Sequence, residues 1–105
     1  MPRSNQHLPI QTRITEALIK FIQDHHGIVD SDLSQCLEWL KKGDIDNAVH
    51  SATKVKAFGM GSITDWYPDP IHETENGQYL NSVLLSLTHY WCYLIGLSFE
   101  SSDKP

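Results

Sequence analysis

The chain has 105 residues, of which 40% are hydrophobic and 20% are charged, and its formal net charge is -5 at pH 7. This length suits one domain with one modest core, and the apolar content is too high for an intrinsically disordered chain. The acidic balance and the scattered basic residues disfavour nucleic-acid binding, because that function needs clustered Lys and Arg to neutralise phosphates. We therefore expect a single domain over residues 1–105 that binds no nucleic acid.

The first periodic stretch predicts one helix after an irregular start. Residues 1–9 show no apolar repeat, so we expect them to form an irregular N-terminal arm. Apolar side chains then recur at intervals of three and four residues, which predicts a helix over about residues 11–26. Gly27 follows directly and is expected to stop this helix, since glycine is common just past a helix end.

Capping residues divide the next stretch into two further helices. Asp30, Ser31 and Asp32 precede an apolar stripe and offer capping oxygens and negative charge to the first free backbone N–H groups of a second helix. Gly43 closes that helix after two lysines, and Asp44 can cap a third helix immediately. A connection this short predicts that the two helices form an antiparallel hairpin.

The periodic pattern fails after Phe58, which predicts a long loop over residues 57–78. Connections of this length in a compact domain are usually functional, disordered or hold short structure of their own. The loop contains several large apolar side chains that would be costly to expose. We therefore expect an ordered loop that packs on the bundle, with one or two helical turns over residues 62–67.

The last helix is predicted over residues 78–99, with a polar tail at residues 100–105. Residues 78–99 hold no Asp, Glu, Lys or Arg and are long enough to cross a bilayer, yet they contain several polar side chains and no flanking basic cluster. We favour a buried, central helix over a membrane anchor. A homodimer made through this helix would also explain its apolar character. The expected fold is all-α, a small bundle of four main helices with a long ordered loop before the last helix.

Two glycines within the long loop suggest a specific turn. Gly59 and Gly61 could let backbone N–H groups approach a phosphate, but the preceding strand and the Gly-Lys-Ser/Thr ending of phosphate loops are missing. We favour a structural turn at Gly59, Met60, Gly61 and Ser62. Gly59 would cap the preceding helix, and Ser62 would cap a short helix with Asp65 in the capping-box position.

Residues suited to metal binding or catalysis do not form a recognisable site. The six histidines lack the spacing of a zinc helix, and His89 is expected to be a hydrogen-bonded polar residue of the core. Cys36 and Cys92 lie among apolar residues, as buried free thiols of a cytoplasmic protein would. We predict no metal ligands, no cofactor and no catalytic residues.

Aromatic and acidic residues share one part of the loop and suggest a binding surface. Aromatic side chains bury a large area at interfaces, and neighbouring carboxylates steer a basic partner. The alternative is that Trp66 and Tyr67 cover the core as a lid. The predicted partner-binding residues are Asp65, Trp66, Tyr67, Asp69, Glu73 and Glu75.

Residues 58–65 read Phe-Gly-Met-Gly-Ser-Ile-Thr-Asp. This stretch resembles a group of small, uncharacterised bacterial helical proteins that carry a Gly-Gly-Met-Gly-Ser-aromatic-Asn-Asp motif. Trp39-Leu40 and Gly43-Asp44 are similar to that group as well, and the resemblance covers about residues 39–95. The chain departs from the motif at Phe58, Ile63 and Thr64. The resemblance implies a shared helical fold and a loop whose backbone conformation requires particular residues. Its glycines are expected to make one turn that seats Met60 and Ile63 against the bundle.

The leading functional hypothesis is a small, acidic, cytoplasmic protein-binding module with a basic protein partner, of the immunity or antitoxin type. Negative charge, small size and the aromatic, acidic loop support it. The alternative is a small enzyme or ligand-binding domain whose pocket lies between the turn at residues 59–65 and the last helix, near His89 and Trp91. That alternative requires a concave cavity with convergent polar groups.

Overall fold

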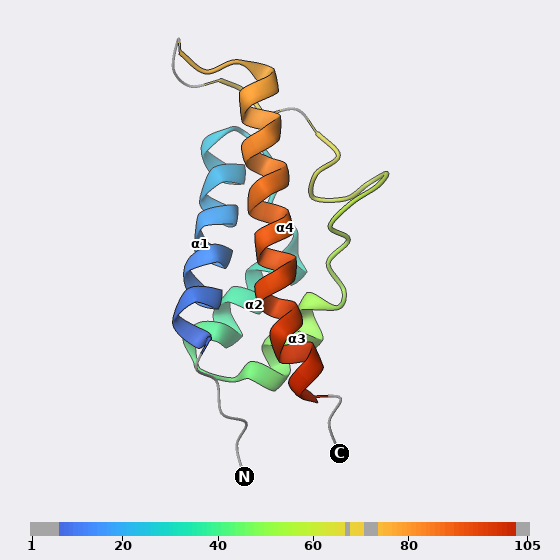
Figure 1. Cartoon of the computed structure of the whole chain (residues 1–105). Coiled ribbons are helices and arrows are strands. Elements are labelled where there is room, and N and C mark those ends of the chain that lie inside the picture. The colour runs from blue at the N-terminus through green and yellow to red at the C-terminus, as the bar shows by residue number, and fades with distance from the viewer. Residues whose placement is uncertain (1–6, 67, 71–73, 103–105) are drawn as a thin grey trace.

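The computed structural model describes residues 7–66, 68–70 and 74–102 of the chain. Within these residues the elements are α1 (Leu8–Asp24), α2 (Ser31–Lys41), α3 (Ile45–Ala52) and α4 (Gly77–Ser102). The predicted all-α bundle of four main helices is therefore confirmed (Figure 1).

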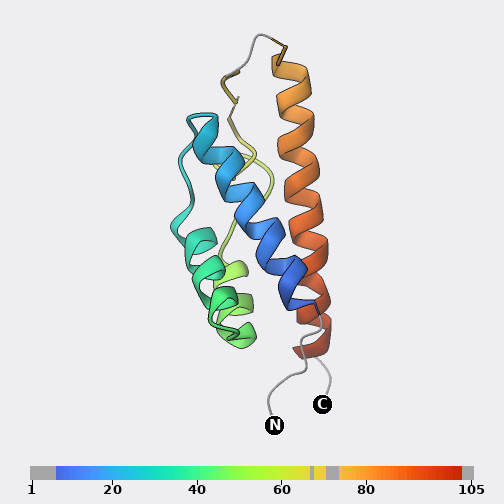
Figure 2. The ribbon, with the colours of Figure 1, turned by 90° about the vertical axis from the view of Figure 1, so that its left-hand side faces the viewer.

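The middle element of the bundle is α1. Figure 2 shows α4 along one side of α1 and the α2–α3 pair on the other side. Contacts between α1 and α2, between α1 and α4, and between α3 and α4 join these layers. The expectation that the last helix is central is wrong, because one face of α4 is exposed to solvent along most of its length.

The first helix begins earlier than predicted, at Leu8. Pro9 lies in its first turn, where the missing proline N–H costs no helical hydrogen bond. The predicted arm over residues 1–9 therefore overlaps the start of α1. Residues 1–6 of that arm lie outside the described part of the chain.

The residue that turns the chain at the end of α1 is His26, not Gly27. His26 has a φ of 67°, in the left-handed region, and its N–H donates a hydrogen bond of 3.3 Å to the carbonyl oxygen of Gln23. The N–H of Gly27 donates a bond of 2.7 Å to the carbonyl oxygen of Ile22. These two bonds form a Schellman motif in which glycine usually occupies the left-handed position.

Of the three residues predicted to cap α2, Asp30 is the N-cap, and the predicted cap of α3, Asp44, is confirmed. Oδ1 of Asp30 accepts a hydrogen bond of 2.7 Å from the N–H of Asp32. Oδ1 of Asp44 accepts one of 3.1 Å from the N–H of Asn47. Between the helices Gly43 has a φ of 76°, so it provides the left-handed residue that ends α2.

The last helix has an N-cap that the periodicity analysis missed. Oδ1 of Asn76 accepts a hydrogen bond of 2.8 Å from the N–H of Tyr79, and asparagine is among the preferred N-cap residues. At its other end α4 continues to Ser102. The described part of the predicted tail, residues 100–102, is therefore helical, and residues 103–105 lie outside the described part of the chain.

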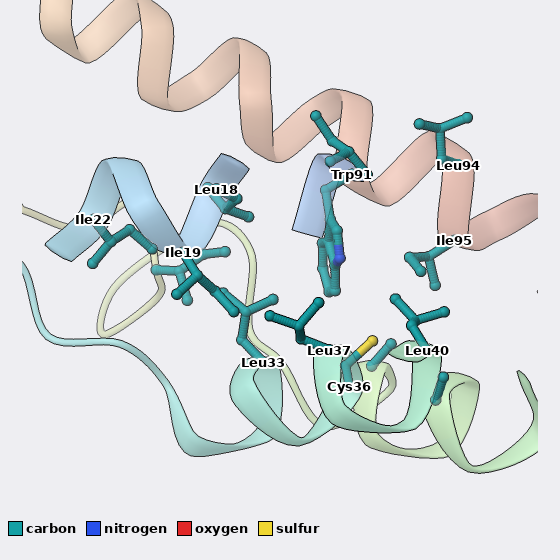
Figure 3. Close-up of a cluster of buried hydrophobic side chains, with 14 of the residues drawn as sticks. Leu18, Ile19, Ile22, Leu33, Cys36, Leu37, Leu40, Trp91, Leu94 and Ile95 are labelled. Atoms are coloured by element: carbon teal, nitrogen blue, oxygen red, sulfur yellow. The ribbon is translucent and has the colours of Figure 1, made fainter. Parts of the chain in front are cut away.

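The core lies where α1, α2 and α4 meet. In Figure 3 the indole of Trp91 projects from α4 toward Leu37 of α2. Nε1 of Trp91 donates a hydrogen bond of 3.0 Å to Oγ1 of Thr15 on α1, so the indole joins all three helices. Cys36 lies in the same core, as predicted, and burial raises the pKa of its thiol to about 12.

Candidate functional site

The two loop glycines make the predicted structural turn. Gly59 does not cap the preceding helix as expected, because α3 ends at Ala52 with Thr53 as its C-cap. Gly59 has a φ of 97° and Gly61 a φ of 76°, so both occupy backbone conformations that favour glycine. Lys56 stabilises the turn through one backbone and one side-chain hydrogen bond. Its carbonyl oxygen accepts a hydrogen bond of 3.0 Å from the N–H of Ile63, and its Nζ donates one of 2.6 Å to the carbonyl oxygen of Met60.

This turn seats only one of the two side chains assigned to it. Ile63 is buried in the core, whereas Met60 is 86% exposed. The expectation that the turn packs Met60 against the bundle is therefore wrong. The left-handed residues on either side of Met60 project it outward from the turn.

The helix expected over residues 62–67 is absent from the described part of this segment, which consists of turns. Oδ2 of Asp65 accepts a hydrogen bond of 2.7 Å from the N–H of Gly61. Oγ of Ser62 accepts one of 3.3 Å from the N–H of Thr64. Asp65 and Ser62 thus satisfy backbone donors as a capping box would, but they close a turn instead of starting a helix.

Trp66 covers the end of the core, as the lid interpretation predicts. Its side chain is half-buried and packs on the hydrophobic core. Nε1 donates a hydrogen bond of 2.7 Å to the carbonyl oxygen of Ile63, so the polar end of the indole is satisfied within the loop.

Asp69 and Glu75 attach the loop to the end of α1. The N–H of Asp69 donates a hydrogen bond of 3.2 Å to the carbonyl oxygen of His25, and its Oδ2 lies 3.3 Å from Nδ1 of His26. Oε1 of Glu75 lies 3.5 Å from Nε2 of His25, where both side chains are largely buried. Asp69 remains exposed, while Glu75 faces inward and contributes little to an external surface.

A hollow of about 430 Å³ with a mixed polar and apolar lining lies between this loop and the end of α1. We call it the loop hollow. Ile28 forms part of its edge and is 93% exposed, although it is fully apolar. The lining residues are His26, Gly27, Ile28, Gly61, Ser62, Asp65 and Trp66.

The structure brings three of the six predicted binding residues together around this hollow. Asp65 and Trp66 line it, and Asp69 contacts His26 at its edge. Tyr67 and Glu73 lie outside the described residues. Sequence reasoning missed Ile28, whose only signal was its place after Gly27 and outside both neighbouring apolar stripes.

A second cavity, of about 220 Å³, lies beside Trp91 but differs from the predicted ligand pocket. Its opposite wall comes from the end of α3 and residues 55–57, not from the turn at residues 59–65. Its lining is mainly apolar and includes Cys92, whose pKa is raised by burial, so this thiol is a poor nucleophile. The cavity lacks the convergent polar groups that the enzyme alternative requires.

His89 lies on the surface, contrary to its expected place in the core. Its ring contacts Phe58 at a centroid distance of 4.5 Å. The exposed side chains around it follow one side of α4, which we call the outer face of α4. This face consists of Tyr79, Ser82, Val83, Ser86, His89, Tyr90 and Tyr93, with Val83 half-buried.

Within residues 7–66, 68–70 and 74–102, no three His, Cys, Asp or Glu side chains form a group that could hold a metal ion. Among the same residues, no helix combines the length and apolarity needed to cross a membrane.

Comparison of the chain with protein-family models, curated proteins and solved structures gives no match. The resemblance of residues 58–65 to the bacterial glycine motif therefore stays a prediction.

Proposed function

We propose that this protein is a small acidic protein-binding module whose partner presents a basic surface with an apolar side chain. The observation that carries the proposal is the exposure of Ile28 and Met60, at 93% and 86%, beside the loop hollow. Ile28 lines the hollow, and Met60 directly precedes Gly61 of its opposite wall. Burial of such a side chain against a partner contributes about 1.5–3 kcal/mol.

The loop hollow has the layout of a small interface. The half-buried side chain of Trp66 forms part of its wall, and aromatic residues are enriched at interface hot spots. Polar groups of Ser62 and Asp65 line the hollow together with the apolar side chains, and polar residues are typical of the rim of an interface. The turn is held by its own hydrogen bonds, so little further ordering is needed on binding.

Charge determines the kind of partner. Asp65 and Asp69 are exposed at the hollow, and Asp65 bonds to a neutral amide that leaves its negative charge uncancelled. The net charge of -5 adds a longer-range attraction for basic molecules. An immunity or antitoxin protein that covers a basic toxin surface is the type of module that this charge favours. The free thiols of Cys36 and Cys92 support a cytoplasmic setting.

The test is affinity capture followed by titration. Immobilised wild-type protein and an Ile28→Ser, Met60→Ser variant are exposed to lysate of the source cells, and the retained proteins are identified by mass spectrometry. The matched control is Ile10→Ser, because Ile10 is an exposed isoleucine at the opposite end of α1. Circular dichroism checks that all three proteins fold, since exposed substitutions usually change stability by less than about 0.5 kcal/mol.

We expect a basic protein to be retained by the wild type and the control and lost by the double variant. Titration of that purified protein should show affinity at least about tenfold lower for the double variant, and lower affinity at higher salt. The proposal fails if the double variant retains the same proteins with unchanged affinity, or if the partner is acidic and binding is insensitive to salt.

A further inference from the structure

Most N–H groups around the loop hollow already donate hydrogen bonds within the chain. The indole Nε1 of Trp66 donates to the carbonyl oxygen of Ile63, and the N–H of Gly61 donates to Oδ2 of Asp65. Four further backbone N–H groups of the lining donate to carbonyl oxygens of α1 or of the loop, namely those of His26, Gly27, Ser62 and Asp65. The hollow therefore has few donors left for a ligand that needs them.

Asp65 supplies a charged acceptor to the same hollow, where its side chain is exposed. Its Oδ2 accepts the hydrogen bond of 2.7 Å from Gly61, which fixes the carboxylate on the turn, while Oδ1 accepts none from the described residues. Asp65 forms no ion pair with any residue that the structure describes. Lys56 directs its Nζ to a backbone carbonyl oxygen instead, and His26 contacts Asp69. One carboxylate is therefore held in place without a cation.

Apolar side chains line the hollow together with this carboxylate. The half-buried indole of Trp66 forms part of the wall, and Ile28 lies at the edge with 93% of its surface exposed. The volume of about 430 Å³ lies within the range of about 300–1,000 Å³ that is typical of ligand pockets. A group that fills this hollow must combine positive charge and hydrogen-bond donors with an apolar stem.

We propose that the loop hollow receives an arginine side chain of the basic protein partner, with the guanidinium group on the carboxylate of Asp65 and the methylene stem along Ile28 and Trp66. A guanidinium group carries five N–H donors and no acceptor, so it suits a site whose own donors are engaged and whose carboxylate is free. This inference rests on the proposed function, because it names the side chain by which the basic partner is recognised.

Arginine fits this lining better than lysine does. Its planar fork can give a carboxylate two parallel hydrogen bonds, and its flat face stacks on aromatic rings such as that of Trp66. The ammonium group of lysine is a compact, strongly hydrated charge without such a face. Both side chains bring an apolar stem to Ile28, so the carboxylate and the indole together determine the preference.

Titration with short peptides, followed by nuclear magnetic resonance, tests arginine recognition without the partner protein. The isotope-labelled protein is titrated with acetylated and amidated tripeptides of glycine around a central arginine, lysine or citrulline. Citrulline has the length and shape of arginine but no charge. The N–H signals of Gly61 and of the Trp66 indole report on the hollow, because these groups lie in its lining.

Two variants that lose the same charge locate the site. Asp65→Asn keeps a side-chain oxygen for the N–H of Gly61 but removes the negative charge from the hollow. Asp69→Asn is the matched control, because Asp69 is also exposed but already contacts His26 at the edge of the hollow. The dispersion of the backbone signals shows whether each variant is folded.

We expect the arginine peptide to shift both reporter signals of the wild type with a dissociation constant in the millimolar range, at least about threefold lower than that of the lysine peptide. The citrulline peptide should shift neither signal. Asp65→Asn should weaken binding of the arginine peptide at least about fivefold, and Asp69→Asn less than about twofold.

Equal binding of the arginine and lysine peptides, equal losses in the two variants, or unshifted signals of Gly61 and Trp66 would overturn the inference. The result is separate from the capture experiment. A captured basic partner beside a peptide that does not bind would overturn this inference alone. Binding of the arginine peptide without any captured partner would support arginine recognition and count against the proposed function.

Discussion

The indole of Trp66 lies directly against the backbone of Gly27. A Cβ added at Gly27 would come within 2.8 Å of Cζ2 of Trp66 and within 2.7 Å of Cγ2 of Ile22. Real side chains do not approach this closely, so the close fit of loop to helix depends on the missing side chain at Gly27.

We predict that Gly27→Ala lowers the free energy of unfolding by about 1–3 kcal/mol, because the new methyl group must displace Trp66 or strain Ile22. Urea unfolding followed by tryptophan fluorescence measures the change. The control is Gly96→Ala, since no atom lies within 4 Å of a Cβ added there.

Gly96 lies inside α4, so alanine should raise stability by about 0.5–1 kcal/mol through its higher helix propensity. Opposite signs at the two glycines are the expected result. Equal effects at Gly27 and Gly96 would show that the contact with Trp66 is unimportant.

His26 and Gly43 occupy equivalent positions at the ends of α1 and α2, with φ of 67° and 76°. We predict that His26→Gly raises the free energy of unfolding by about 1 kcal/mol, because it relieves the left-handed strain of a residue that carries a Cβ. The exposed contact of His26 with Asp69 offsets little of this gain.

At the matched position, Gly43→Ala should lower the free energy of unfolding by about 1 kcal/mol, because it adds a Cβ to a residue in the left-handed conformation. Thermal unfolding of both variants measures the two changes. A decrease in the melting temperature of His26→Gly would mean that the contact with Asp69 outweighs the backbone strain.

Thr15 and Thr88 are fully buried, but they differ in one hydrogen bond. Each hydroxyl donates to a carbonyl oxygen four residues earlier in its own helix, and Thr15 also accepts from Nε1 of Trp91. We predict that Thr15→Val lowers the free energy of unfolding by about 1–3 kcal/mol, because it leaves a buried indole N–H without its acceptor.

Thr88→Val makes the same change of side chain. It should lower the free energy of unfolding by less than about 1 kcal/mol, since no buried donor loses its only acceptor. Chemical unfolding of the two variants isolates the contribution of the indole bond. Comparable losses would indicate that the hydroxyl bonds within each helix, and not the bond to Trp91, determine the effect.

Asp44 makes the stability of the fold depend on pH in the acidic range. A side-chain hydrogen bond from Asn47, followed by the backbone N–H of the same residue, lowers the pKa of Asp44 below its ordinary value of 3.8. A lowered folded-state pKa stabilises the protein above the unfolded-state pKa, and this contribution is lost as the pH falls through the folded-state pKa.

We therefore predict that the melting temperature of the wild type falls more steeply than that of Asp44→Asn between about pH 5 and about pH 2. Asparagine also caps helices well but has no proton to gain, so it is the matched control. Parallel pH profiles would show that the Asp44 cap does not contribute to acid stability.

Local chemistry made the two short helices predictable. The carboxylates of Asp30 and Asp44 bond to N–H groups within the next three residues, and the φ of Gly43 is set by its own turn. Such interactions act over a few neighbouring residues, so the amino-acid sequence by itself determined where α2 and α3 begin and the all-α class.

Contacts between residues distant in the chain determined which side chains are buried and which are exposed. Residues 78–99 looked central because they lack charge, yet α4 lies on one side of α1 and the α2–α3 pair on the other, so the outer face of α4 remains exposed. The fit of Trp66 on Gly27 joins positions that no periodicity connects. The exposure of Ile28 and Met60 likewise depends on which neighbours the bundle brings near them. Burial is a property of the assembled surface, so only the tertiary structure could show which apolar side chains were left for a partner.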